Sequence, residues 1–345
     1  AITELQNYIT VHPGSKPLSK YDLVYGGDFT KWLKFANSLK LRLAMRTCYV
    51  EGFEVNGKTS RKLAEEAVKN GVITENGENA LLQSGNGISV FHPLKICWDN
   101  YEDVRMGADM ESIMKGYSDP RLSKFFQESA YGEVGDKYHG ARLGVDITNK
   151  TNYVKLSAPN IFAETPVLWM CAAEIYFLRA EGRLRGWSMG GETEDLYNMG
   201  ITKSFEQWGV ALGDYLTRGD DYKPMQFTAP SGTTGNAVAA STITIAWNAV
   251  DREEKKLERI ITQKWIAMFP EGQEAWSEHR RTGYPRLFNL YGTNASSGQV
   301  EDSGPRRIPF PSTEYDTNTT EVNKAVTDFL GGNDYGNVCL LYTSD

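Results

Sequence analysis

The sequence lacks an apolar run long enough to cross a membrane. Its longest candidate, Val167–Leu178, is interrupted by Glu174, whereas a spanning helix needs about 20 predominantly apolar residues. Apolar residues make up 40% of the chain and aromatic residues 12%, which is enough to fill a globular interior. We therefore predict a packed globular chain without membrane-spanning helices.

An excess of basic residues is also missing. The chain has 44 acidic and 37 basic residues, so its net charge is −7 at pH 7. Nucleic-acid binding depends on basic surface that neutralises phosphates, and that class of partner is excluded. Cysteine is sparse, with four residues far apart and no C-x-x-C pair. We interpret Cys48 and Cys171, which fall in helical apolar patterns, as small core residues.

Catalytic and metal-binding motifs are absent as well. The chain contains no G-x-S-x-G, Walker or Rossmann pattern. Its four histidines fall in separate segments: His12, His92, His139 and His279. They show no ligand spacing, and the acidic pair Asp220-Asp221 is by itself a weak signal for calcium. We predict neither a metal ion nor a cofactor.

The clearest local pattern is the segment Tyr25–Arg46. Asp28 follows two glycines and is a good N-cap, because its carboxylate can accept backbone N–H bonds from the first helical turn. Apolar residues then recur at helical spacing: Phe29, Trp32, Leu33, Ala36, Leu39, Leu43 and Ala44. Arg42 and Arg46 lie in the last turns, where cations suit the helix dipole. The pattern predicts an amphipathic helix over Asp28–Val50.

Further helical patterns come in neighbouring pairs. The predicted pairs lie near residues 28–71, 165–209 and 252–282. Their expected helices are Asp28–Val50 with Arg61–Asn70 after a Ser60 cap, a helix from Thr165-Pro166 to about Arg185 with Thr193–Trp208, and Arg252–Phe269 with Gly272–Thr282. Two long irregular regions, 76–162 and 210–249, separate the pairs, and Thr242–Trp247 alternates like one short strand. The fold class is therefore mostly α, with little β-strand.

Six segments together resemble the SusD/RagB family of outer-membrane nutrient-binding lipoproteins of Bacteroidetes. They follow the family's order: Tyr25–Arg46, Asp119–Phe126 (DPRLSKFF), Glu164–Trp187, Leu196–Gly209, Ile261–Phe288 and Arg306–Asn318 (RRIPFPSTEYDTN). The resemblance covers nearly the whole chain. It implies one α-helical domain over residues 1–345, built from degenerate tetratricopeptide-type helical pairs. The family's helix matching Tyr25–Arg46 lies further into the chain, so we expect part of the N-terminal scaffold and the lipid anchor to be missing here.

The resemblance also implies a function. Family members bind nutrients, commonly oligosaccharides or polysaccharides, at the cell surface and pass them to a SusC-like TonB-dependent outer-membrane transporter. We accordingly expect a non-catalytic glycan binder that needs no cofactor and that contacts the membrane through a lipid anchor absent from this chain. A peptide or another nutrient as ligand, a glycoside hydrolase and a helical scaffold that binds protein remain alternatives.

Glycan recognition has suitable residues in the irregular regions. Sugar rings offer apolar faces and hydroxyl groups, so they favour exposed aromatic side chains beside amides, carboxylates and arginines. Trp98-Asp99-Asn100-Tyr101 combines these types in four expected loop residues. We predict ligand-binding roles for Trp98, Asn100, Tyr101, Tyr131, Tyr138, Arg142, Tyr222 and Phe227. Most aromatic residues of a globular chain are buried, so burial is the competing interpretation for each of them.

Other residues of these segments are interpreted as structural. Glu174 and Glu181 lie two turns apart on one helix, about 10.5 Å along its axis, which is too far for a typical pair of glycosidase carboxylates. Glu174 is expected to pair with Arg42 or Arg46, because buried charges need partners. Glu181 has Arg185 four residues on, as in a surface ion pair. The remaining structural assignments are Asp28 as cap, Trp32 and Trp276 as scaffold, and Arg280, Arg281, Arg306 and Arg307 as anchors that bind C-terminal loops through carboxylates.

Overall fold

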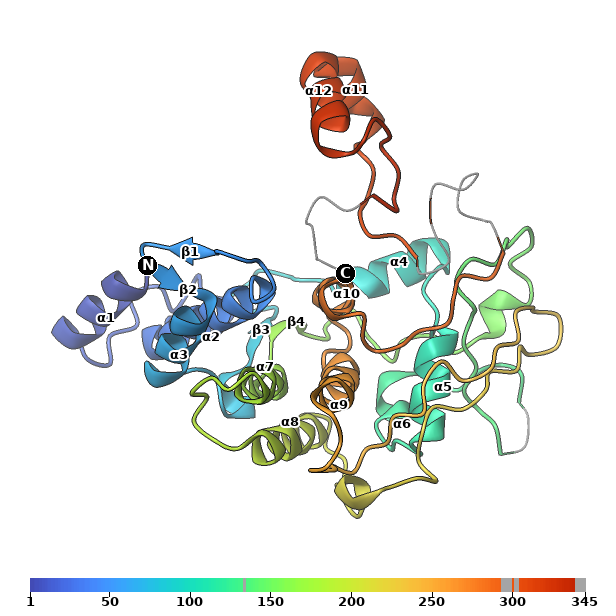
Figure 1. Ribbon diagram of the computed structural model, residues 1–345, viewed down its shortest axis with the longest axis horizontal. Helices are drawn as coiled ribbons and strands as arrows, with labels where there is room; N and C mark the ends of the chain where they lie inside the picture. Colours follow the sequence, from blue (N-terminus) through green and yellow to red (C-terminus); the bar gives the residue numbers. More distant parts are fainter. Residues whose placement is uncertain (133–134, 293–299, 301–303, 339–345) are drawn as a thin grey trace.

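The computed structural model describes residues 1–132, 135–292, 300 and 304–338. Figure 1 shows a mainly helical molecule, coloured along the chain. The α-helices are α1 (Ile2–Val11), α2 (Phe29–Arg46), α3 (Ser60–Lys69), α4 (Pro93–Tyr101), α5 (Ala108–Gly116), α6 (Leu122–Phe125), α7 (Ala172–Leu184), α8 (Thr193–Gln207), α9 (Glu253–Ala267), α10 (Gly272–Thr282), α11 (Ser312–Thr317) and α12 (Thr319–Phe329). Short 3₁₀ turns are η1 (Asn76–Glu78), η2 (Tyr153–Lys155) and η3 (Tyr215–Thr217). The strands form two antiparallel pairs, β1 (Glu54–Val55) with β2 (Lys58–Thr59), and β3 (Ala80–Leu82) with β4 (Val167–Met170).

The core is organised around α7. This helix packs against α2, α8 and α9, and its side chains Ile175, Phe177 and Leu178 are completely buried. At the crossing with α8, a Cβ on Gly200 would lie 2.8 Å from the Phe177 ring, so a larger residue there would force the helices apart. The pairs α2–α3, α7–α8 and α9–α10 lie next to one another, and α4–α6 lie beyond α9 and α10 (Figure 1). The mostly α fold with tetratricopeptide-type helical pairs is confirmed.

The start of α2 agrees with its local signal, whereas the start of α3 differs by one residue. Asp28 accepts the backbone N–H groups of Thr30 (3.1 Å) and Lys31 (3.2 Å), as an N-cap does. The predicted cap of α3 was one residue too late, because Thr59 accepts the Lys62 N–H group and Ser60 is already helical.

Two predictions of local structure were wrong. No helix begins at Thr165-Pro166: residues 167–170 form β4, which pairs with β3, and α7 starts after the extended residue Cys171. No strand forms at 242–247. Ile243 and Ile245 are buried as the alternation suggested, but side chains bind this extended segment in place of a partner strand. Tyr117 donates to the Ile243 carbonyl at 3.1 Å and Tyr197 to the Ile245 carbonyl at 2.7 Å.

The expected loop 76–162 was also only partly correct, since it contains α4, α5 and α6. Region 210–249 is irregular apart from η3. In the described ranges, no helix combines the length and the apolarity that crossing a bilayer requires. Cys339 and the residues after it lie outside the described part of the chain.

The hairpin of α11 and α12 projects from the rest of the molecule (Figure 1). Its base is closed by Asp334, which binds the Arg307 guanidinium, the Phe310 N–H group at 2.8 Å and the Tyr315 hydroxyl at 2.8 Å. Arg307 therefore joins the two ends of the hairpin, in line with its expected role as a carboxylate-bound anchor.

Candidate functional site

Helix α4 carries the first predicted binding residues, and it is unusually exposed. Pro93 occupies its first turn, the His92 Nδ1 atom accepts the Leu94 N–H group at 3.2 Å, and Glu102 ends it in a left-handed conformation. Not one α4 residue is buried. Trp98 and Tyr101 are one turn apart and so share a face. The expectation that Trp98, Asn100 and Tyr101 lie in a loop was wrong: they lie on a helix, where Asn100 and Tyr101 are exposed and Trp98 is half-buried.

Trp98 and Tyr101 are held in place by cations from the following segments. The Arg105 guanidinium lies 3.8 Å from the centre of the Trp98 ring, and it also donates to the Val154 carbonyl at 3.0 Å. Lys150 donates to the Tyr101 carbonyl at 2.7 Å and to Asp103 at 2.5 Å. Tyr101 is 62% exposed. One side of the Trp98 ring is therefore covered by a cation, while Tyr101 is open.

Tyr131 contacts the segment 150–155, which also contains Lys150. Its hydroxyl donates to the Asn152 carbonyl at 2.9 Å, and the Lys155 ammonium lies 5.8 Å from its ring centre. Residues 150–155 thus connect Tyr131 with the end of α4. We call the surface formed by Trp98, Asn100, Tyr101, Tyr131 and Lys150 the α4 face.

Two predicted binding residues are buried instead. Phe227 is 3% exposed and packs with Phe288, with ring centres 6.4 Å apart. Arg142 is 7% exposed, covers the Phe288 ring at 4.8 Å and donates to the Asn289 carbonyl at 2.6 Å. Neither side chain has a face open to a sugar, so both predictions were wrong. The competing interpretation, burial, applies to this pair.

Tyr138 and Tyr222 are half-buried. Tyr222 packs under the Arg218 guanidinium at 4.9 Å. Tyr138 lines a hollow of about 440 Å³ beside Lys115 and Asp119. Arg105 and Lys150 were missed by the sequence reasoning, because their contacts with α4 cross a loop and follow no periodicity.

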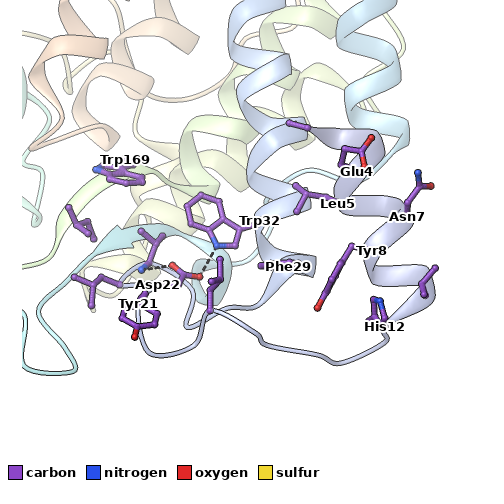
Figure 2. Close-up of a pocket in the computed structure, with 16 residues that line it drawn as sticks. Glu4, Leu5, Asn7, Tyr8, His12, Tyr21, Asp22, Phe29, Trp32 and Trp169 are labelled. Atoms are coloured by element: carbon purple, nitrogen blue, oxygen red, sulfur yellow. Dashed lines mark hydrogen bonds between the residues drawn. The ribbon is translucent and has the colours of Figure 1, made fainter.

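A large hollow lies elsewhere, between α1 and the start of α2. Its volume is about 980 Å³, and its lining is mainly apolar and aromatic, including Tyr8, Phe29, Trp32 and Trp169. Figure 2 shows Trp32 fixed by Asp22, which accepts the indole N–H group at 2.7 Å. Asp22 also accepts the backbone N–H groups of Val24 (3.0 Å), Tyr25 (3.1 Å) and Gly27 (2.7 Å). These bonds fix Trp32 in the scaffold, in line with the role expected for it.

A smaller hollow of about 370 Å³ lies between α4, α5 and α10, and it contains a buried acid. Asp109 is 6% exposed and accepts the Phe288 N–H group at 2.6 Å. Burial raises the pKa of Asp109 to about 6, although this hydrogen bond and Arg142 act in the opposite direction.

We expect Asp109→Asn to stabilise the protein at neutral pH. The raised pKa means that the folded state favours protonated Asp109. Protonated Asp109 stabilises the folded state below about pH 4, and this stabilisation is lost as the pH rises through about 6. A difference of about two pKa units corresponds to roughly 3 kcal/mol at pH 7. Asn keeps the acceptor for Phe288. Urea unfolding at pH 4, 5.5 and 7 measures the effect, and an equal difference between wild type and variant at all three values would contradict it.

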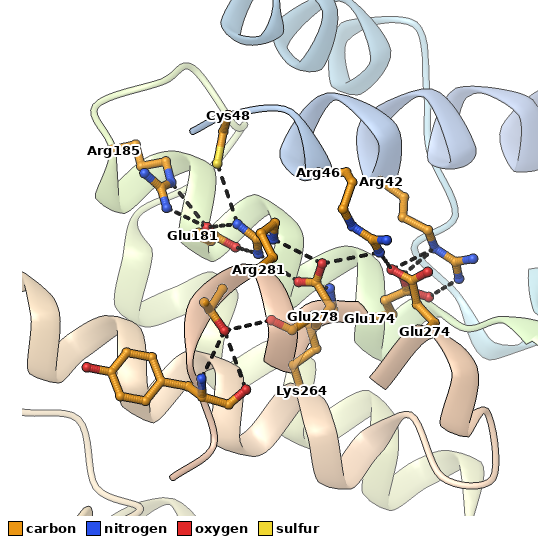
Figure 3. Close-up of polar contacts among 12 residues, drawn as sticks. Arg42, Arg46, Cys48, Glu174, Glu181, Arg185, Lys264, Glu274, Glu278 and Arg281 are labelled. Carbon is orange, nitrogen blue, oxygen red and sulfur yellow. Dashed lines mark hydrogen bonds and ion pairs between the residues drawn. The ribbon is translucent and has the colours of Figure 1, made fainter. Parts of the chain in front are cut away.

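Charged side chains of four helices meet in a buried network (Figure 3). Arg42 of α2 binds Glu174 of α7 through two bonds of 2.7 and 2.6 Å. Arg46 binds Glu274 of α10 and lies 3.4 Å from Glu278. Glu174 is 1% exposed. The Glu174 partner is therefore Arg42, one of the two that were expected.

Glu181 is not the surface residue that was expected. It is completely buried and accepts from Arg185 (2.8 Å) and from Arg281 (2.7 and 2.6 Å). Arg281 also binds Glu278 at 2.7 Å, so it connects α7 with α10 and not a C-terminal loop. Neither Glu174 nor Glu181 has a carboxylate oxygen free for catalysis.

The two other residues assigned to the scaffold of α10 lie together. In the described part of the chain, Arg280 contacts the Trp276 ring at 4.6 Å in place of a carboxylate. The Trp276 indole donates to the Pro305 carbonyl at 3.2 Å. Trp276, and not the Arg280 charge, thus contacts the segment that follows α10.

Comparison with known proteins gives a family match over almost the entire chain. The family described as Susd and RagB outer membrane lipoprotein matches residues 1–343. No curated protein matches the chain.

Solved structures are similar over the full length of the chain. A SusD homologue from Bacteroides ovatus is 37% identical with a TM-score of 0.88, over 100% of this chain and 72% of that one. A SusD homologue from Bacteroides thetaiotaomicron is 35% identical with a TM-score of 0.87, over 98% and 70%. A chitin-binding SusD homologue from Flavobacterium johnsoniae is 38% identical with a TM-score of 0.89, over 100% and 70%.

Proposed function

This chain belongs to the family of SusD and RagB outer-membrane lipoproteins, and we propose that it binds a glycan on the α4 face without changing it chemically. The observation that carries the proposal is the exposure of α4. A helix with Trp98, Tyr101 and no buried residue does not serve the core. The chitin-binding relative supports a glycan, and chito-oligosaccharides are the first ligands to test.

The chemistry of the α4 face fits a sugar chain. Tyr101 offers an open ring to the apolar face of a pyranose, and Trp98 is held rigid by Arg105. Asn100 and Asp99 are exposed beside them and can exchange hydrogen bonds with hydroxyl groups. Because α4 is exposed and offers few deep anchors, we expect modest affinity.

Family membership extends this proposal to the cell. The protein would act as a lipoprotein on the outer surface of the outer membrane and deliver its glycan to a SusC-like TonB-dependent transporter. The family description supports the membrane location, and the transporter is the partner that the family resemblance implies.

A non-catalytic role is supported by the arrangement of the acids. Glu174 and Glu181, the pair considered for glycoside hydrolysis, are buried and bound by arginines. A general acid or nucleophile must reach the scissile bond, and these two side chains reach only protein. Binding without hydrolysis is therefore the function that the geometry favours over a hydrolase.

Native gel electrophoresis in the presence of glycans tests the proposal, with titration calorimetry for the ligand that binds best. We expect Tyr101→Ala and Trp98→Ala each to weaken binding roughly tenfold or more, as loss of an aromatic anchor does. Tyr21→Ala is the matched control, because Tyr21 is 77% exposed but lines the distant hollow at α1. It should bind like the wild type.

Three results would contradict parts of this proposal. Steady release of reducing ends would show a hydrolase. Binding of peptides and of no glycan would make the ligand class wrong. Glycan binding that is unchanged in both variants would place the site away from the α4 face.

A further inference from the structure

We infer that Glu111, Asp136 and His139 form a site for one divalent transition-metal ion, of which Zn²⁺ is the natural probe. Each residue offers one donor atom, and the three atoms lie within 4.8 Å of one another. Glu111 comes from α5, whereas Asp136 and His139 come from the segment after α6. This site is independent of the proposed glycan function.

The positions of Glu111 and His139 are fixed before any ion binds. Glu111 is 6% exposed, and one of its oxygens accepts the Gly140 N–H group at 2.5 Å. The His139 backbone is bound on both sides by Ser157, whose Oγ accepts at 3.2 Å and whose N–H group donates at 2.9 Å. A Cβ on Gly140 would lie 2.7 Å from the Gly107 backbone. This close approach of the two backbones places His139 next to the start of α5.

His139 is the observation that points to a ligand. Its side chain is 4% exposed, yet neither ring nitrogen has a hydrogen-bond partner. Nδ1 faces the second Glu111 oxygen at 3.9 Å, which is too long for a hydrogen bond. Buried polar atoms are normally paired, and an unpaired one costs about 1–3 kcal/mol. An ion between His139 and the two carboxylates would give Nδ1 the partner that it lacks.

The donor set selects the kind of ion. One imidazole and two carboxylates suit Zn²⁺, whereas Ca²⁺ and Mg²⁺ take oxygen ligands almost exclusively. Tetrahedral zinc places its donors roughly 3.4 Å apart at bond lengths near 2.1 Å. The three donors therefore have to approach by about 1 Å. Asp136 is 46% exposed and is the residue free to make that movement.

In this structure the Lys115 ammonium is the cation that binds the two carboxylates. Its ammonium donates to Glu111 at 2.7 Å and also to Asp136. The adjoining hollow of about 440 Å³ is lined by both Lys115 and Asp136, so the ammonium has room to leave toward solvent. The ion and Lys115 thus compete for the same two carboxylates. Removing the lysine charge should strengthen metal binding.

Titration calorimetry with ZnCl₂ tests the site in the full chain. His12 and Cys97, which are exposed, are first replaced by His12→Ala and Cys97→Ser to remove other zinc ligands. We expect one equivalent of Zn²⁺ to bind and to raise the melting temperature, with reversal by a chelator. Asp136→Asn should weaken binding at least about tenfold, and Lys115→Met should strengthen it at least about tenfold.

Two further variants make the test decisive. Glu128→Gln is the matched control, since Glu128 binds Lys137 in the same segment but has no histidine beside it, and it should bind Zn²⁺ like the parent. His139→Gln should abolish binding. Should His139→Gln fail to fold, the variants of Asp136 and Lys115, which are less buried than His139, still decide the question. Absence of zinc binding by the parent, or equal affinity in the parent and Asp136→Asn, would overturn the inference.

Discussion

We expect Glu278→Gln to lower the free energy of unfolding by about 3–5 kcal/mol, the usual cost of removing one partner from a buried ion pair. Glu278 is 3% exposed and binds Lys264 at 2.8 Å and Arg281 at 2.7 Å. Gln fills the same volume, so the loss comes from charge and not from packing. It leaves the Lys264 ammonium, itself 1% exposed, without an anion.

The pH dependence of unfolding identifies the cause. Burial alone would raise the pKa of Glu278, but Arg281 and Lys264 outweigh burial and hold the pKa well below its ordinary value. The folded state thus favours the charged form. Its stabilisation is present above the unfolded pKa of about 4.3 and is lost as the pH falls below that value. The difference between wild type and Glu278→Gln should therefore shrink below about pH 4.

Urea unfolding at pH 7 and pH 3.5 measures both effects. Glu192→Gln is the matched control, because Glu192 binds Arg183 at 3.0 Å but is 70% exposed. Exposed ion pairs contribute about 0–1 kcal/mol, so this variant should unfold nearly like the wild type. Equal losses in the two variants would mean that burial does not set the strength of the Glu278 contacts.

The sequence predicted well where a helix buries one face. In α2, Asp28 signals the start and the apolar spacing signals the buried face, and the structure has the helix at Phe29–Arg46. The pairing of Glu174 with a helix-α2 arginine followed from the cost of an unpaired buried charge. The first inference uses signals that act over a few neighbouring residues. The second requires only that some cation lies beside the buried carboxylate.

The missed helices α4 and α5 are short and differ in burial. In α5 seven consecutive residues, Ala108–Met114, are buried, including Asp109 and Glu111. In α4 no residue is buried. Each of these helices has nine residues, about two and a half turns, so the 3.6-residue repeat recurs too few times to separate it from a loop. Region 76–162 was therefore expected to be a loop.

The binding residues were predictable by type but not by exposure. Trp98 and Phe227 are both aromatic residues in expected loops, yet Phe227 packs on Phe288 while Trp98 lies on an exposed helix. No residue near Phe227 in the sequence indicates that it packs on Phe288, which is 61 residues away. Likewise, Glu111 and His139 meet through backbone bonds at Gly140 and Ser157. Such contacts depend on tertiary structure, which a single sequence does not reveal.

The second large effect is expected in the DPRL segment at the start of α6. Arg121 and Asp119 have completely buried side chains and are joined by bonds of 3.0 and 2.6 Å. Arg121 also donates to Ser204 at 2.8 Å and to Tyr215 at 3.2 Å. Asp119→Asn leaves the guanidinium without an anion in the core. We expect it to lower the free energy of unfolding by about 3–5 kcal/mol.

Replacing both partners of the ion pair separates its charges from their surroundings. Arg121→Met removes the charge and leaves Asp119 with the Tyr215 hydroxyl at 2.7 Å, so it should also destabilise the protein strongly. The double variant Asp119→Leu/Arg121→Met removes both charges, and apolar replacements of a buried pair are often neutral or stabilising. It should therefore unfold at higher urea concentration than Asp119→Asn. A double variant less stable than Asp119→Asn would instead assign the stability to the bonds with Ser204 and Tyr215, because those contacts disappear from the double variant as well.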